Sequence, residues 1–125
     1  MTSAIESYFL DKGKAEPVRR DELLYEEGSE PQHVFFVESG SFVLSRKEGA
    51  KDDQLLVGHK RKGSLIGEAA ALDREIRTVS VRASEDARVR KITAESFTDA
   101  LKYNAKLCYE VAVELARTLR TATTN

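Results

Sequence analysis

The segment Gly67–Ala83 is the most informative stretch of the sequence, and it reads GEAAALDREIRTVSVRA. A glycine turn is followed by one helical turn of small residues, a charged loop, and a strand that Arg77 is expected to open. A helix N-terminus exposes free backbone N–H groups and a partial positive charge, which favour an anion. Arg77 adds a forked cation that matches phosphate oxygens. Glu68 could accept hydrogen bonds from vicinal hydroxyls, so the segment predicts a ligand of the nucleotide type.

This segment resembles the phosphate-binding cassette of cyclic nucleotide-binding domains. The family pattern is roughly a hydrophobic residue, Gly-Glu-x-Ala-Leu, a short loop, and then Arg-(Ala/Ser/Thr)-Ala-x-Val. The matching positions are Ile66, Gly67, Glu68, Ala70, Leu72, Arg77, Thr78 and Val81. The resemblance continues upstream through Glu27-Gly28, Val34–Val37, Ser39-Gly40 and Gly63, and it covers roughly residues 18–120. It implies a mainly β fold, a double-stranded β-helix (jelly roll), with a short N-terminal helix and C-terminal helices.

The resemblance also implies roles for individual residues. Arg77 would clamp the exocyclic phosphate and Glu68 would meet the ribose hydroxyl, while Gly67 would allow close approach of the backbone. The expected cyclic-nucleotide-binding residues are Ile66, Gly67, Glu68, Ala69, Ala70, Arg77 and Thr78. Because Thr78 permits guanine without requiring it, the expected ligand is cAMP or cGMP. No catalytic residue, metal or further cofactor is expected.

Each of these residues also has a simpler interpretation. Arg77 could be a solvated strand arginine, and Glu68 a carboxylate that favours the N-terminus of a helix. The alanines are strong helix formers. The sequence alone leaves both interpretations open.

Bulk composition limits the class of protein. The 125 residues allow one domain, residues 1–125, with a real core. With a net charge of −1, a broad nucleic-acid-binding or membrane-binding face is not expected. The chain has one cysteine, Cys108, which fits a reducing compartment, and no apolar stretch approaches the ~20 residues that span a bilayer. These features predict a cytoplasmic protein that binds neither DNA nor a membrane.

Hydrophobic periodicity predicts the order of the elements. Ser3–Glu6 forms a capping-box pattern that should begin a short helix. From about residue 18 to 92, short apolar runs separated by turn residues predict an all-β sandwich or barrel. The expected strands cover 23–25, 33–38, 41–47, 55–57, 78–82 and 88–92, with a bulge or hairpin at Gly40 and a polar tip at 49–53. Ile92 falls out of phase with Val89.

Two C-terminal helices are predicted over about residues 94–122. The first should run from Glu95 to Tyr103, and Asn104 should cap the second. The apolar stripe expected on the second helix consists of Cys108, Val111, Ala112, Leu115 and Leu119. In the family the equivalent helix covers the base and often forms a dimer interface, and this stripe does not separate the two roles. The threonines expected near the base are Thr118, Thr121 and Thr123.

The sequence is compatible with two functions. The first is a regulatory module that binds a cyclic nucleotide and signals by moving its C-terminal helices, either through a homodimer or a partner protein, or as a fragment of a longer protein. The alternative is a ligand-silent domain of the same fold that serves as an interaction or dimerisation module. The acidic loop Asp73–Ile76, where the family commonly has Gly and Pro, supports this second function.

An enzyme and a DNA-binding protein are not expected. The chain has only two histidines, His33 and His59, and no His-x-His pair. Metal sites need clustered ligands, and nothing resembles a nucleophile paired with a base. The basic triplet Lys60–Lys62 precedes a glycine turn and is interpreted as a solvated loop.

Overall fold

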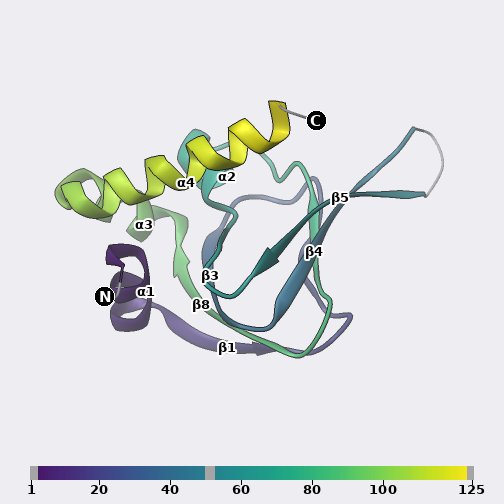
Figure 1. The fold of residues 1–125 in the computed structure, drawn as a ribbon, viewed down its shortest axis with the longest axis horizontal. Helices are drawn as coiled ribbons and strands as arrows, with labels where there is room; N and C mark the ends of the chain where they lie inside the picture. The colour runs from purple at the N-terminus through teal and green to yellow at the C-terminus, as the bar shows by residue number, and fades with distance from the viewer. Residues whose placement is uncertain (1–2, 50–52, 124–125) are drawn as a thin grey trace.

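The computed structural model describes residues 3–49 and 53–123, so part of the expected polar tip, residues 50–52, lies outside the described residues. Figure 1 shows the order of the elements along the chain. They are α1 (Ala4–Lys12), β1 (Lys14–Val18), β2 (Leu23–Tyr25), β3 (His33–Ser39), β4 (Ser41–Lys47), β5 (Gln54–Arg61), β6 (Leu65–Ile66), α2 (Glu68–Asp73), β7 (Ser80–Ala83), β8 (Ala87–Thr93), α3 (Ala94–Tyr103) and α4 (Ala105–Thr123).

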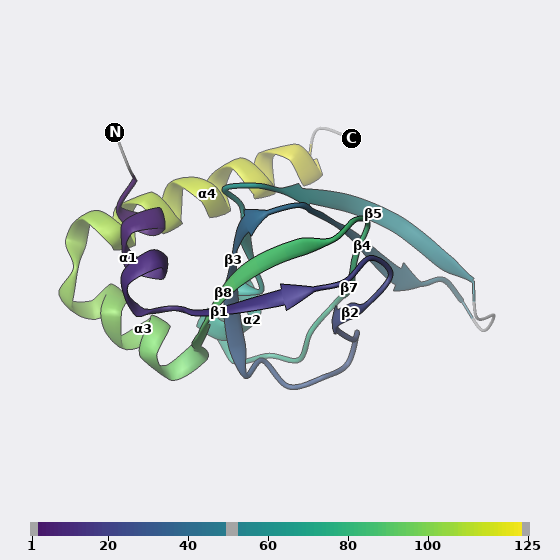
Figure 2. The same ribbon diagram turned by 90° about the horizontal axis from the view of Figure 1, so that it is seen from below.

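Over the described residues the strands form two four-stranded antiparallel sheets, with the orders β1-β8-β3-β6 and β2-β7-β4-β5. The two views in Figures 1 and 2 place α1, α3 and α4 together on the side of β3 and β8, while the β4–β5 hairpin extends away from them. The expected fold class is therefore confirmed: a mainly β jelly roll with a short N-terminal helix and C-terminal helices.

Strand β3 explains how one sheet can separate two parts of the core. Its alternate residues Val34 and Phe36 pack in one hydrophobic cluster with the helices. Phe35 and Val37 pack in a second cluster between the two sheets. Successive strand residues point to opposite faces, so β3 is buried on both sides and appears in the sequence as a continuous apolar run.

The same two clusters explain the phase change in β8. Val89 lies opposite Val37 and belongs to the cluster between the sheets, whereas Ile92 lies opposite Val34 and belongs to the helix cluster. Both side chains are buried, on opposite faces of the strand. The irregular pattern in the sequence thus reflects a strand with two apolar partners.

Two local predictions about the strands need correction. Gly40 is not part of a hairpin within one sheet: it connects β3 of the first sheet to β4 of the second, and the register shift lies between Val37 and Ser39. The Gly40 φ is +85°, and an added Cβ would lie 2.6 Å from the Cα of Ala87. The β region also begins earlier than residue 18, because Lys14–Val18 pairs with β8.

The predicted helix caps are present. The Ser3 hydroxyl accepts the backbone N–H of Glu6, and the Asn104 side chain accepts that of Leu107. Thr93 caps α3 in the same way, accepting the N–H of Ser96. These side-chain acceptors satisfy N–H groups that a helix leaves without partners.

The predicted apolar stripe on α4 was partly wrong. Leu107 and Val111 are buried, and Leu115 packs against them. Cys108 is exposed. The stripe is thus rotated by about one residue, because α1, α3 and β3 contact the Leu107 face of the helix.

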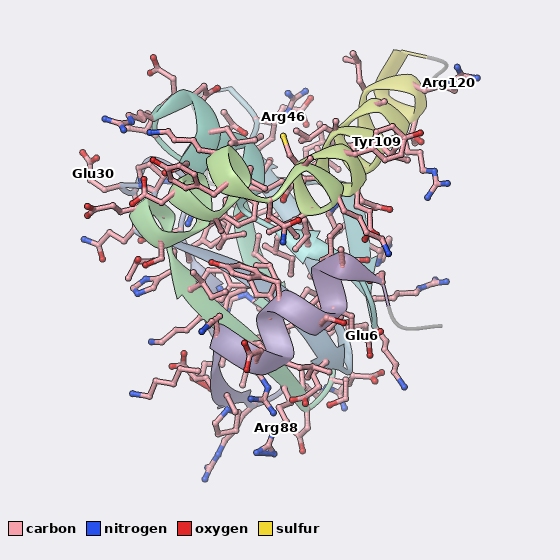
Figure 3. All side chains as sticks on the ribbon, turned by 90° about the vertical axis from the view of Figure 1, so that its left-hand side faces the viewer. Glu6, Glu30, Arg46, Arg88, Tyr109 and Arg120 are labelled. Atoms are coloured by element: carbon pink, nitrogen blue, oxygen red, sulfur yellow. The ribbon has the colours of Figure 1, made fainter. Side chains whose placement is uncertain are left out.

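The outer surface of the helices is polar apart from isolated side chains. Figure 3 shows Tyr109 on α4 and Glu6 on α1, and the Tyr109 side chain is largely exposed. Among the helices in residues 3–49 and 53–123, none combines the length and apolar character needed to cross a membrane.

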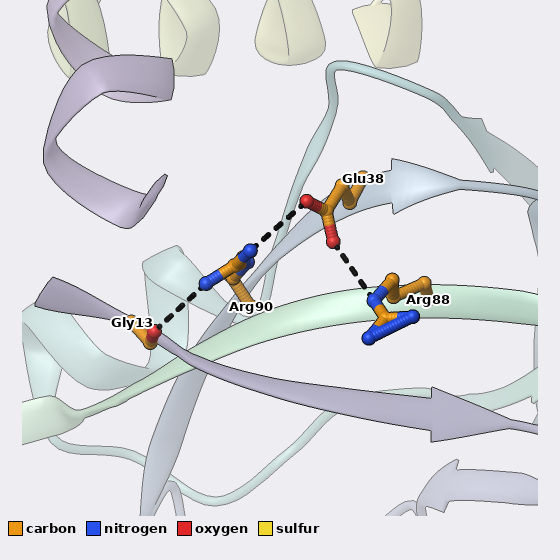
Figure 4. Close-up of polar contacts among 4 residues, drawn as sticks. All are labelled: Gly13, Glu38, Arg88 and Arg90. Atoms are coloured by element: carbon orange, nitrogen blue, oxygen red, sulfur yellow. Dashed lines mark hydrogen bonds and ion pairs between the residues drawn. The ribbon is translucent and has the colours of Figure 1, made fainter. Parts of the chain in front are cut away.

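A cluster of charges holds β3, β8 and the end of α1 together (Figure 4). Glu38 pairs with Arg88 at 3.3 Å and with Arg90 at 3.2 Å. Arg90 also donates a hydrogen bond of 3.5 Å to the carbonyl of Gly13. In this cluster the acidic group has its cationic partners within the chain.

Candidate functional site

The expected cassette begins at a left-handed residue. Gly67 has φ +84° and forms the N-cap of α2, directly after β6. Non-glycine residues rarely adopt this φ. The short helix ends at Arg74, which is also left-handed with φ 60°.

Arg77 is almost completely buried, with 3% of its surface exposed. Its guanidinium group donates one hydrogen bond of 2.9 Å to the Gly67 carbonyl and another to the His33 carbonyl. Its backbone N–H donates to the Ser29 carbonyl. The interpretation of Arg77 as a solvated strand arginine is therefore wrong. The residue lies in the loop before β7, which begins at Ser80 rather than at Thr78.

Gly67 and Arg77 are packed directly against each other. A Cβ added at Gly67 would lie 2.4 Å from Arg77 Nη1 and 3.1 Å from its Cζ. The glycine is thus needed twice, for its φ and for the close approach of the guanidinium group.

Tyr25 holds the other side of Arg77 and was not identified from the sequence. The Arg77 Cζ lies 4.1 Å from the centre of the Tyr25 ring, in the arrangement of a cation–π interaction. Burial raises the pKa of Tyr25 to about 12, although the charge of Arg77 lowers it. Burial also lowers the pKa of Arg77, while Tyr25 and Glu68 raise it.

Glu68 is the second buried charged residue, with 6% of its surface exposed. Burial raises the pKa of its carboxyl group, and its own backbone N–H is the strongest of the effects that lower it. Lys60 and Arg77 also lower the pKa, whereas Glu114 of α4 raises it. Glu68 is therefore more than a helix-end carboxylate, because it is buried among charges from several elements.

These residues surround one cavity of about 210 Å³. All seven residues expected from the sequence, Ile66, Gly67, Glu68, Ala69, Ala70, Arg77 and Thr78, line it. The lining that sequence reasoning did not assign is Tyr25, Leu44, Lys60 and Val79. Tyr25, Leu44 and Lys60 come from β2, β4 and β5, which are distant in sequence, so no local spacing connects them with the cassette. Val79 lies within the segment Gly67–Ala83 but was expected only as a strand residue.

Of the three threonines expected near the base, only one reaches the cavity in the described structure. Thr118 of α4 lines it, and its hydroxyl donates a hydrogen bond of 3.0 Å to the Glu114 carbonyl. The Thr121 hydroxyl donates instead to Arg117. The side chain of Thr123 lies outside the described residues.

The acidic loop does not face the cavity. Asp73 and Glu75 are exposed, and the Asp73 carboxylate accepts the backbone N–H of Glu75 at 3.0 Å. Neither side chain is part of the cavity lining. Repulsion between this loop and a bound anion is therefore weakened by solvent.

A second cavity of about 340 Å³ lies beside the first and shares Tyr25 and Arg77 with it. Its other charged or titratable lining residues are Glu26, Glu30 and His33. Burial lowers the pKa of His33. Within the described ranges, no group of three or more His, Cys, Asp or Glu residues is placed to hold a metal ion.

Taken together, the first cavity offers a buried cation, a buried carboxylate and the first turn of a helix along one wall. Its other walls provide the apolar side chains of Leu44 and Val79 and the hydroxyls of Thr78 and Thr118. Such a mixture suits a ligand that has an anionic group, hydroxyl groups and a flat apolar part.

Residues 8–104 match the family described as the cyclic nucleotide-binding domain. Uncharacterized NTE family proteins from Mycobacterium bovis and Mycobacterium tuberculosis are 30% identical over 103 residues. The match covers 82% of this chain but 17% of each relative, so the chain spans about one sixth of the length of these proteins.

Similar solved structures show the same fold. The catabolite activator protein of Thermus thermophilus has a TM-score of 0.83 at 23% identity, over 94% of this chain and 55% of that one. An EAL enzyme in its cAMP-bound form has a TM-score of 0.69 at 22% identity, over 89% of this chain and 30% of that one. The same enzyme has also been solved in a cGMP-bound form.

Proposed function

The chain belongs to the cyclic nucleotide-binding domain family, and we propose that it binds cAMP or cGMP in the cavity between α2, Arg77 and α4. The observation that carries the proposal is the pair of buried charges, Arg77 and Glu68, in one cavity. Burying a charged group costs free energy unless the group is paired or hydrogen-bonded. A cyclic nucleotide would offer its phosphate to Arg77 and a ribose hydroxyl to Glu68.

The proposed orientation follows from the charges. The cyclic phosphate lies against Arg77 and the first turn of α2, near the backbone N–H groups of Ala69 and Ala70. The ribose hydroxyl donates to Glu68. The base then extends toward the wall that Leu44, Val79 and the two threonines form.

We further propose that α4 reports the state of the cavity. Thr118 brings this helix into the lining, and Glu114 on the same helix acts on the charge of Glu68. A ligand with different affinity for two positions of α4 would shift the population between them. The exposed Tyr109 and Cys108 on the outer face of α4 are where a partner protein or a second copy of this chain would detect the shift.

One observation favours the alternative, a domain of this fold with a silent cavity. The Arg77 guanidinium already bonds two backbone carbonyls and stacks on Tyr25, so part of its role is structural. The guanidinium group has five N–H donors, which leaves donors for a phosphate. The binding experiment decides between the two functions.

Calorimetric titration of the purified chain with cAMP and with cGMP tests binding. We expect saturable heat with at least one nucleotide, and a loss of roughly 10- to 150-fold in affinity for Arg77→Ala, the value of one charged hydrogen bond of about 1.5–3 kcal/mol. Arg74→Asn is the matched control, because it removes an exposed arginine from the same loop and tolerates positive φ.

Thermal unfolding must accompany the titration, because Arg77→Ala also removes contacts that hold the loop. If the folded wild-type chain gives no heat with either nucleotide, at concentrations where a Kd of about 1 mM would be detected, the binding proposal is wrong and the silent domain is preferred.

The movement of α4 has its own test. Cys108 is the only cysteine in the chain and is exposed on this helix, so it can carry an environment-sensitive fluorophore. We expect nucleotide to change the fluorescence of the wild-type chain but not that of Arg77→Ala. Binding by calorimetry without any change in fluorescence or in amide exchange of α4 would contradict the signalling proposal.

A further inference from the structure

The interpretation of Lys60 as part of a solvated loop is wrong, because Lys60 lies in strand β5. It lies opposite Phe42 of β4, and Phe42 is fully buried between the sheets. Directly opposed residues of an antiparallel pair share a face of the sheet. Lys60 is therefore on the inner face, where its half-buried side chain lines the cavity, whereas its neighbours His59 and Arg61 are exposed.

The ionised form of the buried Glu68 carboxyl is favoured by a positive charge nearby. In the part of the chain that the structure describes, no ion pair within 4.0 Å includes its carboxylate. An isolated buried carboxylate tends to take up a proton. A cation that shares the cavity can oppose this at longer range, because screening is weaker in a buried site.

The charged and titratable groups around Glu68 come from every element packed against it. Lys60 of β5 and Arg77 of the loop before β7 attract its negative charge, and Glu114 of α4 opposes it. Tyr25 of β2 also senses the charge of Glu68. Of the two cations, Lys60 acts more strongly on Glu68, and Arg77 is already bonded to two carbonyls.

We propose that Lys60 is a positioning residue of this cavity, whose ammonium group keeps the Glu68 carboxylate ionised and able to accept a ligand hydroxyl. Only the last part of this inference, the effect on the ligand, rests on the proposed function. The ionisation of Glu68 is a property of the ligand-free chain and can be measured without any nucleotide.

The direction of the effect follows from linkage. When Lys60 loses its charge, the protonated form of Glu68 is favoured, so Glu68 stays protonated to a higher pH. A protonated carboxyl is a poorer acceptor for a ribose hydroxyl. The acidic limb of the affinity profile, where binding weakens as pH falls, therefore moves to higher pH.

The first experiment follows the Glu68 side-chain carboxyl by NMR in the ligand-free protein, with ¹³C-labelled glutamate and Glu68→Gln for assignment. We expect the titration midpoint of Glu68 to rise in Lys60→Gln and to return toward the wild-type value in Lys60→Arg. Lys62→Gln, which removes an exposed lysine two positions away, should leave the midpoint unchanged. Equal midpoints in the wild type and Lys60→Gln overturn the inference.

The second experiment measures nucleotide affinity against pH in the same variants. The acidic limb should move to higher pH in Lys60→Gln, and Lys60→Gln should have little further effect in a Glu68→Gln background. A limb that does not move, or an equal loss at every pH in both backgrounds, contradicts the positioning role. If the wild type binds no nucleotide, the proposed function fails, and the NMR result still decides whether Lys60 ionises Glu68.

Discussion

Glu68 and Glu110 are two glutamates whose carboxyl pKa values are shifted in opposite directions by the fold. Glu110 on α4 accepts the backbone N–H groups of Ala4 and Ile5, at 3.0 and 3.1 Å, at the start of α1. These bonds lower the pKa of Glu110. Glu68 is buried in the cavity, and burial raises its pKa.

The difference separates a charge that the chain itself uses from one that we propose a ligand uses. The negative charge of Glu110 is used by the chain itself, since it caps one helix from another and so ties α1 to α4. That of Glu68 is only partly balanced by its own N–H and by cations in the cavity. A buried carboxyl group in a cavity, with its pKa raised by burial, indicates where a ligand is expected.

The largest effect should come from changing the turn that precedes Glu68. Gly67→Ala forces a Cβ to within 2.4 Å of Arg77 Nη1 and places alanine at φ +84°. We expect nucleotide affinity to fall at least as far as in Arg77→Ala, with a cost of more than about 1 kcal/mol in the free energy of unfolding.

Gly63→Ala is the matched control for this change, because its φ is +91° but its added Cβ meets nothing within 4 Å. It should cost stability through φ alone and leave affinity unchanged. Calorimetry and urea unfolding measure the two quantities. Equal losses of affinity in both variants would mean that contact with Arg77 is not the cause.

Exchanging each carboxylate for an amide should separate the two glutamates by their effect on binding. Glu68→Gln replaces a charged acceptor by a neutral one, and the loss of about 1–2 kcal/mol should weaken nucleotide affinity roughly 5- to 30-fold. Glu110→Gln is expected to change affinity much less. If Glu110→Gln weakens binding as strongly, the tie between α1 and α4 is part of the binding mechanism.

Removing the hydrogen-bond acceptor at Glu110 should instead lower the free energy of unfolding. Glu110→Ala leaves the first N–H groups of α1 without their carboxylate and should cost about 1 kcal/mol, the typical value of a helix cap. Cys108→Ala, which removes an exposed side chain from the same helix, is the control. Chemical denaturation measures both, and equal stabilities for the two variants would show that the α1–α4 tie contributes nothing.

The smallest effect is a difference in pH dependence. Because the folded pKa of Glu68 is raised above 4.5, its stabilising contribution is present below about pH 4.5 and is lost as pH rises through the folded pKa. The folded pKa of Glu110 is lowered from 4.5, so its contribution is present above that value and is lost as pH falls through the folded pKa.

The free energy of unfolding of Glu68→Gln relative to the wild type should therefore increase as pH rises, whereas that of Glu110→Gln should decrease. Denaturant unfolding from pH 3 to 8 gives both differences. Slopes of the same sign for the two variants would contradict the comparison.

Much of the lining of the candidate site could be predicted, because its main residues are close in sequence. Gly67, Glu68 and Arg77 all fall within one turn, one short helix and one loop, so local spacing places them together. The caps at Ser3 and Asn104 were predictable for the same reason, since a capping side chain bonds the backbone three residues away. These are local interactions that a pattern in the chain can indicate.

The predictions that were wrong concern residues whose burial or connection depends on packing against a second element. Leu107 and Cys108 are adjacent on α4, and either could begin an apolar stripe. The contacts with α1, α3 and β3 bury Leu107 and leave Cys108 exposed. The prediction at Gly40 was wrong for a similar reason, because a glycine with positive φ is compatible both with a hairpin and with a connection between two sheets.

Short-range patterns in the chain predict the order of the elements and of the cassette residues, and the family resemblance that the cassette carries implies the mainly β fold with its flanking helices. Tertiary packing, by contrast, buries Arg77 between Gly67 and Tyr25 and brings Lys60 and Thr118 into the cavity lining. Burial and long-range charge balance depend on which distant segments pack together, and no spacing along the chain records that.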